Sequence, residues 1–436
     1  MPRIYLETYG CQMNVADSEL MLGVLAAEGY AQSGVPEGAD VILLNTCAVR
    51  DNAEQRVIGR MGELQRHKFP GSVMGVVGCM AQRLGPILLE QVPAVDLVVG
   101  PDGYRNLPEL LRHAQGGERV SDVGYRSWEH YEDVPQVRES GPTAFVTVQR
   151  GCDYHCTFCI VPTTRGTERS RPLADVVRET RQLVEGGVSQ VTLLGQTVNS
   201  WRVGNEDFAD VLRAVGAVDG VRRIRFTSPY PTDFTPRVIE AMATTGAVCE
   251  HVHLPLQSGS NAVLKRMRRR YTRERYLEVV GKLRHAIPGI TLSTDIIVGF
   301  PGETEAQFEE TLGMVSVAGF DDAYTFKYSM REGTPAERIA GQVPDEVAAA
   351  RLQRLIDAAR QQTRQRNASR VGQVHEVLIE RPAKRGDLML ARTRQNFLVL
   401  VDVPRASVGE YRRVRLTGTT GSTFTGALEH PALAVI

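Results

Sequence analysis

The first quarter of the chain alternates apolar runs with amphipathic stretches. Four apolar runs predict strands, at residues 4–9, 41–45, 73–78 and 96–100. Between the first two strands, the segment from Ala16 to Glu28 has helical spacing and is ended by Gly29. Strands that alternate with helices form parallel sheets. We therefore expect an N-terminal open parallel α/β sheet domain over residues 1–115, followed by a polar linker with glycine and proline over 116–142.

A second series of strands and helices occupies the middle of the chain. Six apolar runs predict strands, at residues 144–149, 190–195, 222–228, 250–256, 290–300 and 322–329. Helical patterns separate them, for example at 173–185, 236–245 and 303–317, and a further helix at 345–366 leads out. The series predicts a central (β/α)6 partial TIM barrel over residues 138–368. Active residues of such barrels lie at the carboxyl ends of the strands.

The last part of the chain changes period. Short alternating runs separated by glycine-bearing turns predict five strands, at residues 374–380, 387–393, 397–403, 411–418 and 422–428. Five strands in so short a segment are typical of a small closed β-barrel of the OB type, a shape that is often used to bind RNA. We therefore expect a C-terminal small β-barrel over residues 371–436.

Composition limits the classes of protein that this chain can be. It has 436 residues, of which 42% are hydrophobic and 23% are charged, so neither a disulfide scaffold nor a disordered chain is expected. No apolar run approaches the ~18 to 20 residues of a spanning helix, and the N-terminus lacks the apolar region of a signal peptide. We expect a soluble, cytoplasmic, monomeric protein with no membrane contact, whose cysteines are reduced.

Charge is balanced over the whole chain but not locally. The chain has 51 basic and 51 acidic residues, which gives no argument for a nucleic-acid partner. From Lys265 to Arg284, however, nine residues are basic and two are acidic. This excess fits either a solvated helix face or contacts with phosphates. The candidate phosphate contacts are Lys265, Arg268, Arg269, Arg270 and Arg273.

Three cysteines follow the first predicted strand of the central barrel. They are Cys152, Cys156 and Cys159, and thiolates at such short spacings can converge on one iron-sulfur cube. Three ligands on a four-iron cube leave one iron open to a substrate. A zinc site, with His155 as the fourth ligand, or a CxxC dithiol are the alternatives. The position at the carboxyl end of a barrel strand favours a reactive centre.

Three other cysteines end three of the N-terminal strands. Cys11, Cys47 and Cys79 each follow a predicted strand directly. Because the carboxyl ends of parallel strands lie along one edge of the sheet, these cysteines could meet in space. Each alone is also compatible with a buried core residue. Cys249 has no partner in the pattern, and we interpret it as core packing.

Seven motifs, in order along the chain, resemble the radical S-adenosylmethionine methylthiotransferases, and specifically their MiaB branch, the tRNA 2-methylthio-isopentenyladenosine synthases. The motifs are TYGCQMNVADSE (8–19), LNTCAVRDNAEQ (44–55), GCMAQ (78–82), CTFCIVPTTRGTERSR (156–171), HLPLQSGS (253–260), MRRRYTRERY (267–276) and TDIIVGFPGETE (294–305). The C-terminal barrel is similar to the TRAM module, an RNA-binding appendage. The sequence departs from the family pattern at Thr197, Tyr230 and Ala391, none of which is a predicted cluster ligand.

The resemblance implies two [4Fe-4S] clusters, one on each cysteine triplet, and S-adenosyl-L-methionine as cosubstrate. Residues expected to contact S-adenosylmethionine are Phe158, Gln196, Asn199, Gln257, Ser258, Asp295 and Gly299. For each of them a core or turn role is the alternative. No side chain is expected to act as a catalytic acid or base, because the cofactors carry the radical chemistry.

The resemblance also implies the reaction and its partners. Sulfur and a methyl group would be added to C2 of N6-isopentenyladenosine next to the anticodon of tRNA, which gives 2-methylthio-N6-isopentenyladenosine. The base would have to be splayed out of the anticodon loop to be reached. The basic cluster and the terminal barrel would contact tRNA phosphates. A flavodoxin or ferredoxin is the expected electron donor.

Overall fold

A computed structural model describes residues 1–48, 51–138 and 140–429, with the backbone alone for 51–55. Its N-terminal layer is the predicted parallel sheet, with strand order β2-β1-β3-β4-β5-β6. The strands are β1 (Arg3–Tyr9), β2 (Ala31–Gln32), β3 (Val41–Thr46), β4 (Val73–Gly78), β5 (Leu97–Val99) and β6 (Val120–Asp122). The helices are α1 (Gln12–Ala27), α2 (Asp51–Leu64), α3 (Cys79–Leu84), α4 (Ile87–Gln91) and α5 (Leu107–Gln115).

Both faces of this sheet are buried, which explains why its strands are almost uninterrupted apolar runs. Alternate side chains of β3 point to opposite sides. Leu43 packs with residues of α1 and α5, whereas Leu44 packs with residues of α2 and α3. One hydrophobic cluster on each face thus fixes the sheet between helices.

The N-terminal layer extends beyond the predicted boundary at residue 115. Strand β6 pairs with β5, and Tyr131, farther along the expected linker, packs in the same core as α1 and α5. Helix α1 begins at Gln12, directly after Cys11, and not at Ala16. These differences arise because an edge strand of three residues is too short to show a hydrophobic period. The first turn of a helix beside the sheet edge is also too short to show one.

The central domain is the predicted partial barrel. Its six parallel strands form two three-stranded sheets, β13-β10-β7 and β14-β15-β16, which meet at a bridge between Ile224 and Val248. The strands are β7 (Thr143–Thr147), β10 (Gln190–Leu194), β13 (Arg223–Phe226), β14 (His251–His253), β15 (Thr291–Val298) and β16 (Asp322–Lys327). The main outer helices are α7 (Leu173–Glu185), α8 (Phe208–Gly216), α9 (Pro236–Thr244), α11 (Arg273–Ala286), α12 (Glu305–Ala318) and α13 (Asp345–Ala368).

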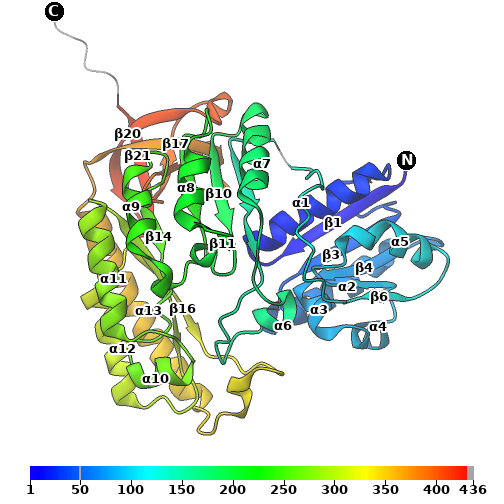
Figure 1. Cartoon of the computed structure of the whole chain (residues 1–436), viewed down its shortest axis with the longest axis horizontal. Helices are drawn as coiled ribbons and strands as arrows, with labels where there is room; N and C mark the ends of the chain where they lie inside the picture. Colours follow the sequence, from blue (N-terminus) through cyan, green and yellow to red (C-terminus); the bar gives the residue numbers. More distant parts are fainter. Residues whose placement is uncertain (49–50, 139, 430–436) are drawn as a thin grey trace, which may run out of the picture.

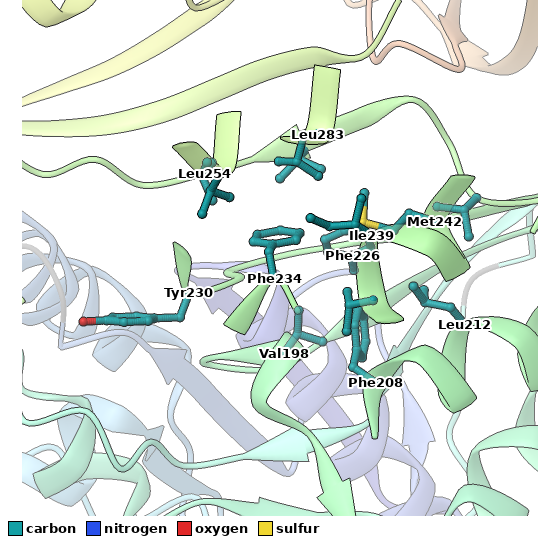
Figure 2. Close-up of a cluster of buried hydrophobic side chains, with 14 of the residues drawn as sticks. Val198, Phe208, Leu212, Phe226, Tyr230, Phe234, Ile239, Met242, Leu254 and Leu283 are labelled. Atoms are coloured by element: carbon teal, nitrogen blue, oxygen red, sulfur yellow. The ribbon is translucent and has the colours of Figure 1, made fainter. Parts of the chain in front are cut away.

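An aromatic and aliphatic cluster holds the helices against the central strands. Phe208 of α8 meets Phe226 of β13 edge to face, with 5.3 Å between ring centroids. Phe234, Ile239 and other side chains continue the cluster toward α9 and α11 (Figure 2). This packing makes the central strands a rigid support for the loops at their ends.

The C-terminal segment is a closed barrel of five strands, as predicted. Its order is β17-β18-β19-β21-β20. The strands are β17 (Val374–Pro382), β18 (Met389–Thr393), β19 (Leu398–Val401), β20 (Tyr411–Thr419) and β21 (Thr423–Leu428). Inward-facing residues such as Val377, Val399 and Phe424 fill the interior, and Ala391 lies among them.

The small barrel covers the amino ends of the central strands. In Figure 1 it lies in red against one end of the green and yellow barrel. Arg394 donates to the Glu250 carboxylate, with Nη2 at 2.7 Å from Oε1. The fully buried Arg223 donates to the carbonyls of Arg392 and Glu376 at 2.8 and 3.0 Å. Arginine side chains therefore fix the two barrels together through carbonyl and carboxylate acceptors.

Among the described residues, no helix combines the length and the apolar character that a bilayer crossing requires.

We predict that Glu250→Ala loosens this docking. The change removes the acceptor of a half-buried guanidinium, at a cost of about 2 kcal/mol. Trypsin cleavage between α13 and β17 should then accelerate about tenfold or more, since cleavage follows the population of the undocked form. Glu240→Ala, which breaks the exposed pair with Arg213, is the matched control and should leave cleavage unchanged. Equal cleavage of wild type and Glu250→Ala would contradict the docking role.

Candidate functional site

The register of the N-terminal sheet brings Cys11, Cys47 and Cys79 to one edge. Tyr9 pairs with Thr46, and Thr46 pairs with Gly78. Cys47 and Cys79 are the residues directly after Thr46 and Gly78, and Cys11 lies two residues beyond Tyr9. Each cysteine therefore lies where a strand ends, and Cys11 and Cys79 lie where α1 and α3 begin.

Glycines make this close approach possible. Gly10 has φ of +144°, and a Cβ there would lie 2.8 Å from Cβ of Cys47 and 2.4 Å from Oδ1 of Asn14. Gly78 has φ of +92°, and a Cβ there would lie 2.5 Å from Oδ1 of Asn45. At Gly10 and at Gly78, the positive φ and the close neighbouring atoms each exclude a side chain. The backbone just before Cys11 and Cys79 is therefore shaped to carry these thiols to the sheet edge.

The second triplet lies on the loop between β8 (Gln149–Arg150) and α6 (Val161–Arg165). Cys152 and Cys156 are buried and Cys159 is half-buried. Burial raises the pKa of Cys152 to about 11 and that of Cys159 to about 12. Such thiols keep their protons at neutral pH and release them when a metal binds. Neither thiol is therefore activated as a free reactive thiolate.

The donor sets fit an iron-sulfur cube. Each triplet offers three thiols, and thiolates on a cube bind separate irons. Within the described residues, no three His, Cys, Asp or Glu side chains form a group that could hold a single metal ion. Cys249, buried beside the fourth central strand, is a core residue in the described structure.

One arginine points at each triplet. Arg165 of α6 donates through Nε to Sγ of Cys79 at 3.2 Å. Arg269, one of the predicted RNA contacts, turns inward and donates to Sγ of Cys156 at 3.4 Å. It also lies over the rings of Tyr230 and Tyr271, 4.4 and 5.0 Å from their centroids. The remaining predicted RNA contacts, Lys265, Arg268, Arg270 and Arg273, lie at or near the surface.

One cysteine of each triplet borders the same large cavity. It has a volume of about 1690 Å³ and runs from Cys11 and Cys159 to the C-terminal barrel, where Glu380, Arg392 and Asn396 line it. The cavity therefore lies between all three parts of the chain. Its size exceeds the ~300–1,000 Å³ of an ordinary small-molecule pocket.

Three of the residues predicted to contact S-adenosylmethionine line this cavity: Phe158, Gln257 and Asp295. Gln257 has φ of +69°, and its Oε1 is buried without a hydrogen-bond partner among the described residues. Gln196 has an unpartnered buried Oε1 as well. Unused buried acceptors of this kind fit a ligand that supplies the donors.

The other three predicted contacts are engaged inside the protein. Asn199 exchanges hydrogen bonds with the backbone of Tyr230 at 2.7 and 3.0 Å. The Oγ of Ser258 lies 3.1 Å from Oγ1 of Thr311. The Gly299 N–H donates to Oε2 of Glu303 at 2.7 Å. These three residues therefore fix the loops behind the cavity wall.

A polar ladder in the cavity was not predicted. Ser293 Oγ lies 3.1 Å from Nε2 of His251 and 2.9 Å from Nδ1 of His253, and Nε2 of His253 lies 3.1 Å from Oδ2 of Asp295. Burial, followed by the nearby charge of Arg225, holds the pKa of His251 well below its usual range, so it is neutral. The signal in the sequence was the two-residue spacing of polar side chains on β14 and β15.

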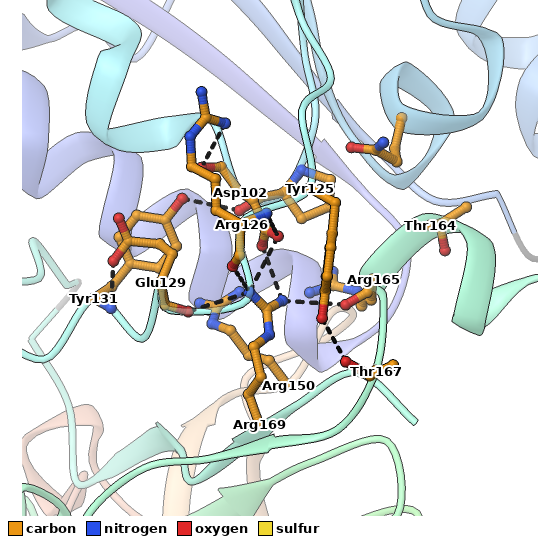
Figure 3. A network of polar contacts seen from close by, with 12 residues as sticks. Asp102, Tyr125, Arg126, Glu129, Tyr131, Arg150, Thr164, Arg165, Thr167 and Arg169 are labelled. Atoms are coloured by element: carbon orange, nitrogen blue, oxygen red, sulfur yellow. Dashed lines mark hydrogen bonds and ion pairs between the residues drawn. The ribbon is translucent and has the colours of Figure 1, made fainter. Parts of the chain in front are cut away.

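The interface behind the cysteines contains a buried ion triad. Asp17 of α1, fully buried, accepts from Arg150 at 2.8 Å and from Arg165 at 2.7 Å. Burial disfavours its charge, but attraction to Arg165 and Arg150 outweighs burial and keeps the pKa of Asp17 below its usual range. In the same interface Asp102 pairs with Arg169 of β9 (Arg169–Ser170) at 2.9 Å (Figure 3). Carboxylates of the N-terminal domain thus meet arginines of the central one.

Comparison with known proteins identifies the class. Residues 146–315 match the model of the radical SAM superfamily, and residues 3–100 match that of the uncharacterized protein family UPF0004. The radical S-adenosylmethionine methyltransferase TsrM from Kitasatospora setae has a similar fold, with a TM-score of 0.59 and 15% identity over 77% of each chain. Residues 146–315 therefore form a radical SAM domain, and the likeness to TsrM shows a shared fold.

Full-length relatives identify the family within that class. The tRNA-2-methylthio-N(6)-dimethylallyladenosine synthase of Geobacillus kaustophilus is 45% identical over 99% of this chain and 83% of the relative. The synthases of Moorella thermoacetica, 45% identical over 94% of both chains, and Cereibacter sphaeroides, 42% identical over 97% and 98%, are similar along their length. The chain belongs to the tRNA-2-methylthio-N(6)-dimethylallyladenosine synthase family.

We predict that Asp17→Asn destabilises the protein by about 3–5 kcal/mol, because it leaves two buried guanidiniums without a counter-charge. Urea unfolding followed by circular dichroism measures this loss. The loss should shrink as the pH falls through the depressed pKa of Asp17, since the wild-type carboxylate then loses its charge too. Glu278→Gln, which removes an exposed carboxylate paired with Arg275 and Lys282, is the control and should leave the midpoint unchanged. An unaltered midpoint for Asp17→Asn would refute the role of the triad.

Proposed function

We propose that this protein is a tRNA methylthiotransferase that converts N6-isopentenyladenosine next to the anticodon into 2-methylthio-N6-isopentenyladenosine. The observation that carries the proposal is the single cavity that Cys11 and Cys159 both border. A reaction that needs two metal centres needs both of them beside one substrate. The names of the full-length relatives support the same reaction.

In this proposal each cysteine triplet holds one [4Fe-4S] cluster. Cys152, Cys156 and Cys159 would hold the cluster that binds S-adenosylmethionine, and Cys11, Cys47 and Cys79 the cluster that serves sulfur insertion. When bound, these groups supply radical chemistry, which the unactivated C2–H of adenine requires because no side-chain base removes its proton at neutral pH. The proposed domains are residues 1–115, whose core also takes in β6 and Tyr131, residues 138–368 and residues 371–436.

The chain's own residues would bind and orient the reactants. Phe158 packs edge to face on Phe300, with 6.5 Å between centroids, and offers a ring to the adenine of S-adenosylmethionine. Asp295 accepts from His253, which fixes its carboxylate for a hydroxyl or amino group of the ligand. Gln196 and Gln257 offer the unused acceptors described above.

Supporting residues would keep this wall in place. Three residues behind the wall, Asn199, Ser258 and Gly299, form hydrogen bonds with neighbouring backbone and side chains of the protein. Because the lumen is closed at one end by the C-terminal barrel, a base that enters from the cluster end displaces water and meets a fixed environment.

The proposed tRNA surface lies beside the cysteine loop. The Arg270 guanidinium lies 4.9 Å from the centroid of the Tyr154 ring, which belongs to that loop. Lys265, Arg268 and Arg273 lie on or next to α10 (Asn261–Arg266) and α11. Phosphates on both sides of a splayed base could meet these cations. We further infer a flavodoxin or ferredoxin as electron donor, a monomeric state and a cytoplasmic location.

Single cysteine variants test the proposed function. Anaerobically reconstituted wild type should bind about eight irons per chain if both centres are four-iron cubes. With isopentenylated tRNA and a reductant, Cys156→Ala should abolish cleavage of S-adenosylmethionine. Cys47→Ala should retain cleavage and lose the methylthio product in nucleoside mass spectrometry.

The control for these variants is Cys249→Ala, which removes a buried thiol outside both triplets and should retain product. Full product from Cys47→Ala, or colourless protein with stoichiometric zinc, would overturn the proposal.

Salt dependence tests the tRNA surface. Arg268→Ala and Arg270→Ala should each weaken binding of an anticodon stem-loop and reduce the slope of log affinity against log salt by about 0.7, the value for one contact to a single strand. Arg213→Ala, on α8 and paired with Glu240, is the control and should keep the wild-type slope. Fluorescence anisotropy at several salt concentrations gives these slopes. Unchanged slopes for both variants would place the tRNA elsewhere.

A further inference from the structure

Arg165 belongs to the central domain but contacts a cysteine of the N-terminal domain. It ends α6, six residues after Cys159. Its Nε donates to Sγ of Cys79 at 3.2 Å, and its Nη2 donates to Asp17 at 2.7 Å. The side chain is 4% exposed, so water does not compete for these contacts. One residue thus connects the loop of one triplet to a thiol of the other.

The position of Arg165 is fixed from both ends. Its carbonyl accepts from Nη2 of Arg169 at 3.1 Å, and Arg169 is itself paired with Asp102 (Figure 3). Its guanidinium keeps one buried nitrogen, Nη1, without a hydrogen-bond partner among the described residues. A buried N–H donor without an acceptor is costly, and it fits a site where the acceptor arrives with a ligand.

The charges of the triad leave a positive excess beside Cys79. Arg150 and Arg165 share the single carboxylate of Asp17, and all three are buried. The guanidinium of Arg165 beside Cys79 is thus only partly neutralised by Asp17 of the N-terminal domain. Cations and N–H donors near the sulfurs stabilise the reduced state of an iron-sulfur centre and raise its reduction potential.

We propose that Arg165 sets the reduction potential of the centre held by Cys11, Cys47 and Cys79, through its hydrogen bond to Cys79 and its unpaired N–H. This inference rests on the proposed function, which places a cluster on these cysteines. Arg165 is a positioning residue: it acts through Cys79. Arg165 ends α6, the helix that follows the Cys152–Cys159 loop. The reduction potential of the N-terminal centre would therefore depend on the docking of the central domain, which carries the other centre.

Arg150 provides a matched control. It makes the same ion pair with Asp17, at 2.8 Å, but no hydrogen bond with a cysteine is present for it among the described residues. Loss of either arginine leaves Asp17 with one partner. A purely structural role of the triad therefore predicts equal effects of the two substitutions, whereas the proposal predicts an effect specific to Arg165.

The test uses the full chain with Cys152, Cys156 and Cys159 replaced by alanine, so that only the N-terminal centre is reconstituted. Redox titration followed by electron paramagnetic resonance gives its midpoint potential. Arg165→Gln should shift the potential to more negative values and change the g-values. Arg165→Lys, which keeps the charge but not the forked donor, should shift it less. Arg150→Gln, which removes the same charge but no hydrogen bond to a cysteine, should shift the potential less and leave the g-values at the parent values.

The outcomes separate the two proposals. If Arg165→Gln fails to retain iron while Arg150→Gln retains it, the specific contact of Arg165 with the centre is supported. Three outcomes would overturn the role of Arg165 and leave the proposed function standing. They are equal potentials in all variants, equal shifts for Arg165→Gln and Arg150→Gln, and loss of iron from both of these variants. A parent chain that binds no iron at all would overturn the second cluster, and with it both proposals.

Discussion

The buried carboxylate of Asp17 joins the two halves of the site, and the Asp102–Arg169 pair supports the same interface. Asp17 lies between Arg150 and Arg165, and it belongs to α1, the helix that Cys11 caps. The same helix therefore carries a cysteine of one triplet and the anion that binds the domain of the other. A buried carboxylate without its partners would be expelled or protonated, so the geometry of the interface is strongly specified.

The shared cavity follows from this interface. Two domains that each bind a metal centre could react in sequence only if the substrate moved between them. Here the edge of the N-terminal sheet faces the open end of the central barrel, so Cys11 and Cys159 line the same space. The third domain closes the opposite end with arginine contacts to carbonyls. Each of the three parts thus has a physical role in enclosing one reactant.

Much of this could be predicted from the sequence. The strands of the sheet and of both barrels appear as apolar runs of the right period, and the six cysteines stand out because they follow strands or lie at short spacing. The ion triad could not be predicted, because Asp17 and Arg165 are 148 positions apart and meet only when two domains dock. The contact between Arg269 and Cys156 could not be predicted for a related reason: a run of arginines shows charge but not which member turns inward.

The local pattern also does not show which polar side chains have partners inside the protein. Asn199 and Ser258 have the polarity of ligand contacts, yet their partners are neighbouring protein groups. His251 and His253 looked like ordinary strand residues, although alternate positions on β14 and β15 place them in the lumen beside Ser293 and Asp295. The central claim is that the Asp17 interface brings two metal centres to one cavity. An anaerobic crystal structure of the reconstituted protein, with iron located by anomalous scattering, tests it most directly. The account predicts two groups of iron on the walls of one cavity with Asp17 between Arg150 and Arg165; iron in two separate cavities, or at one triplet alone, would contradict it.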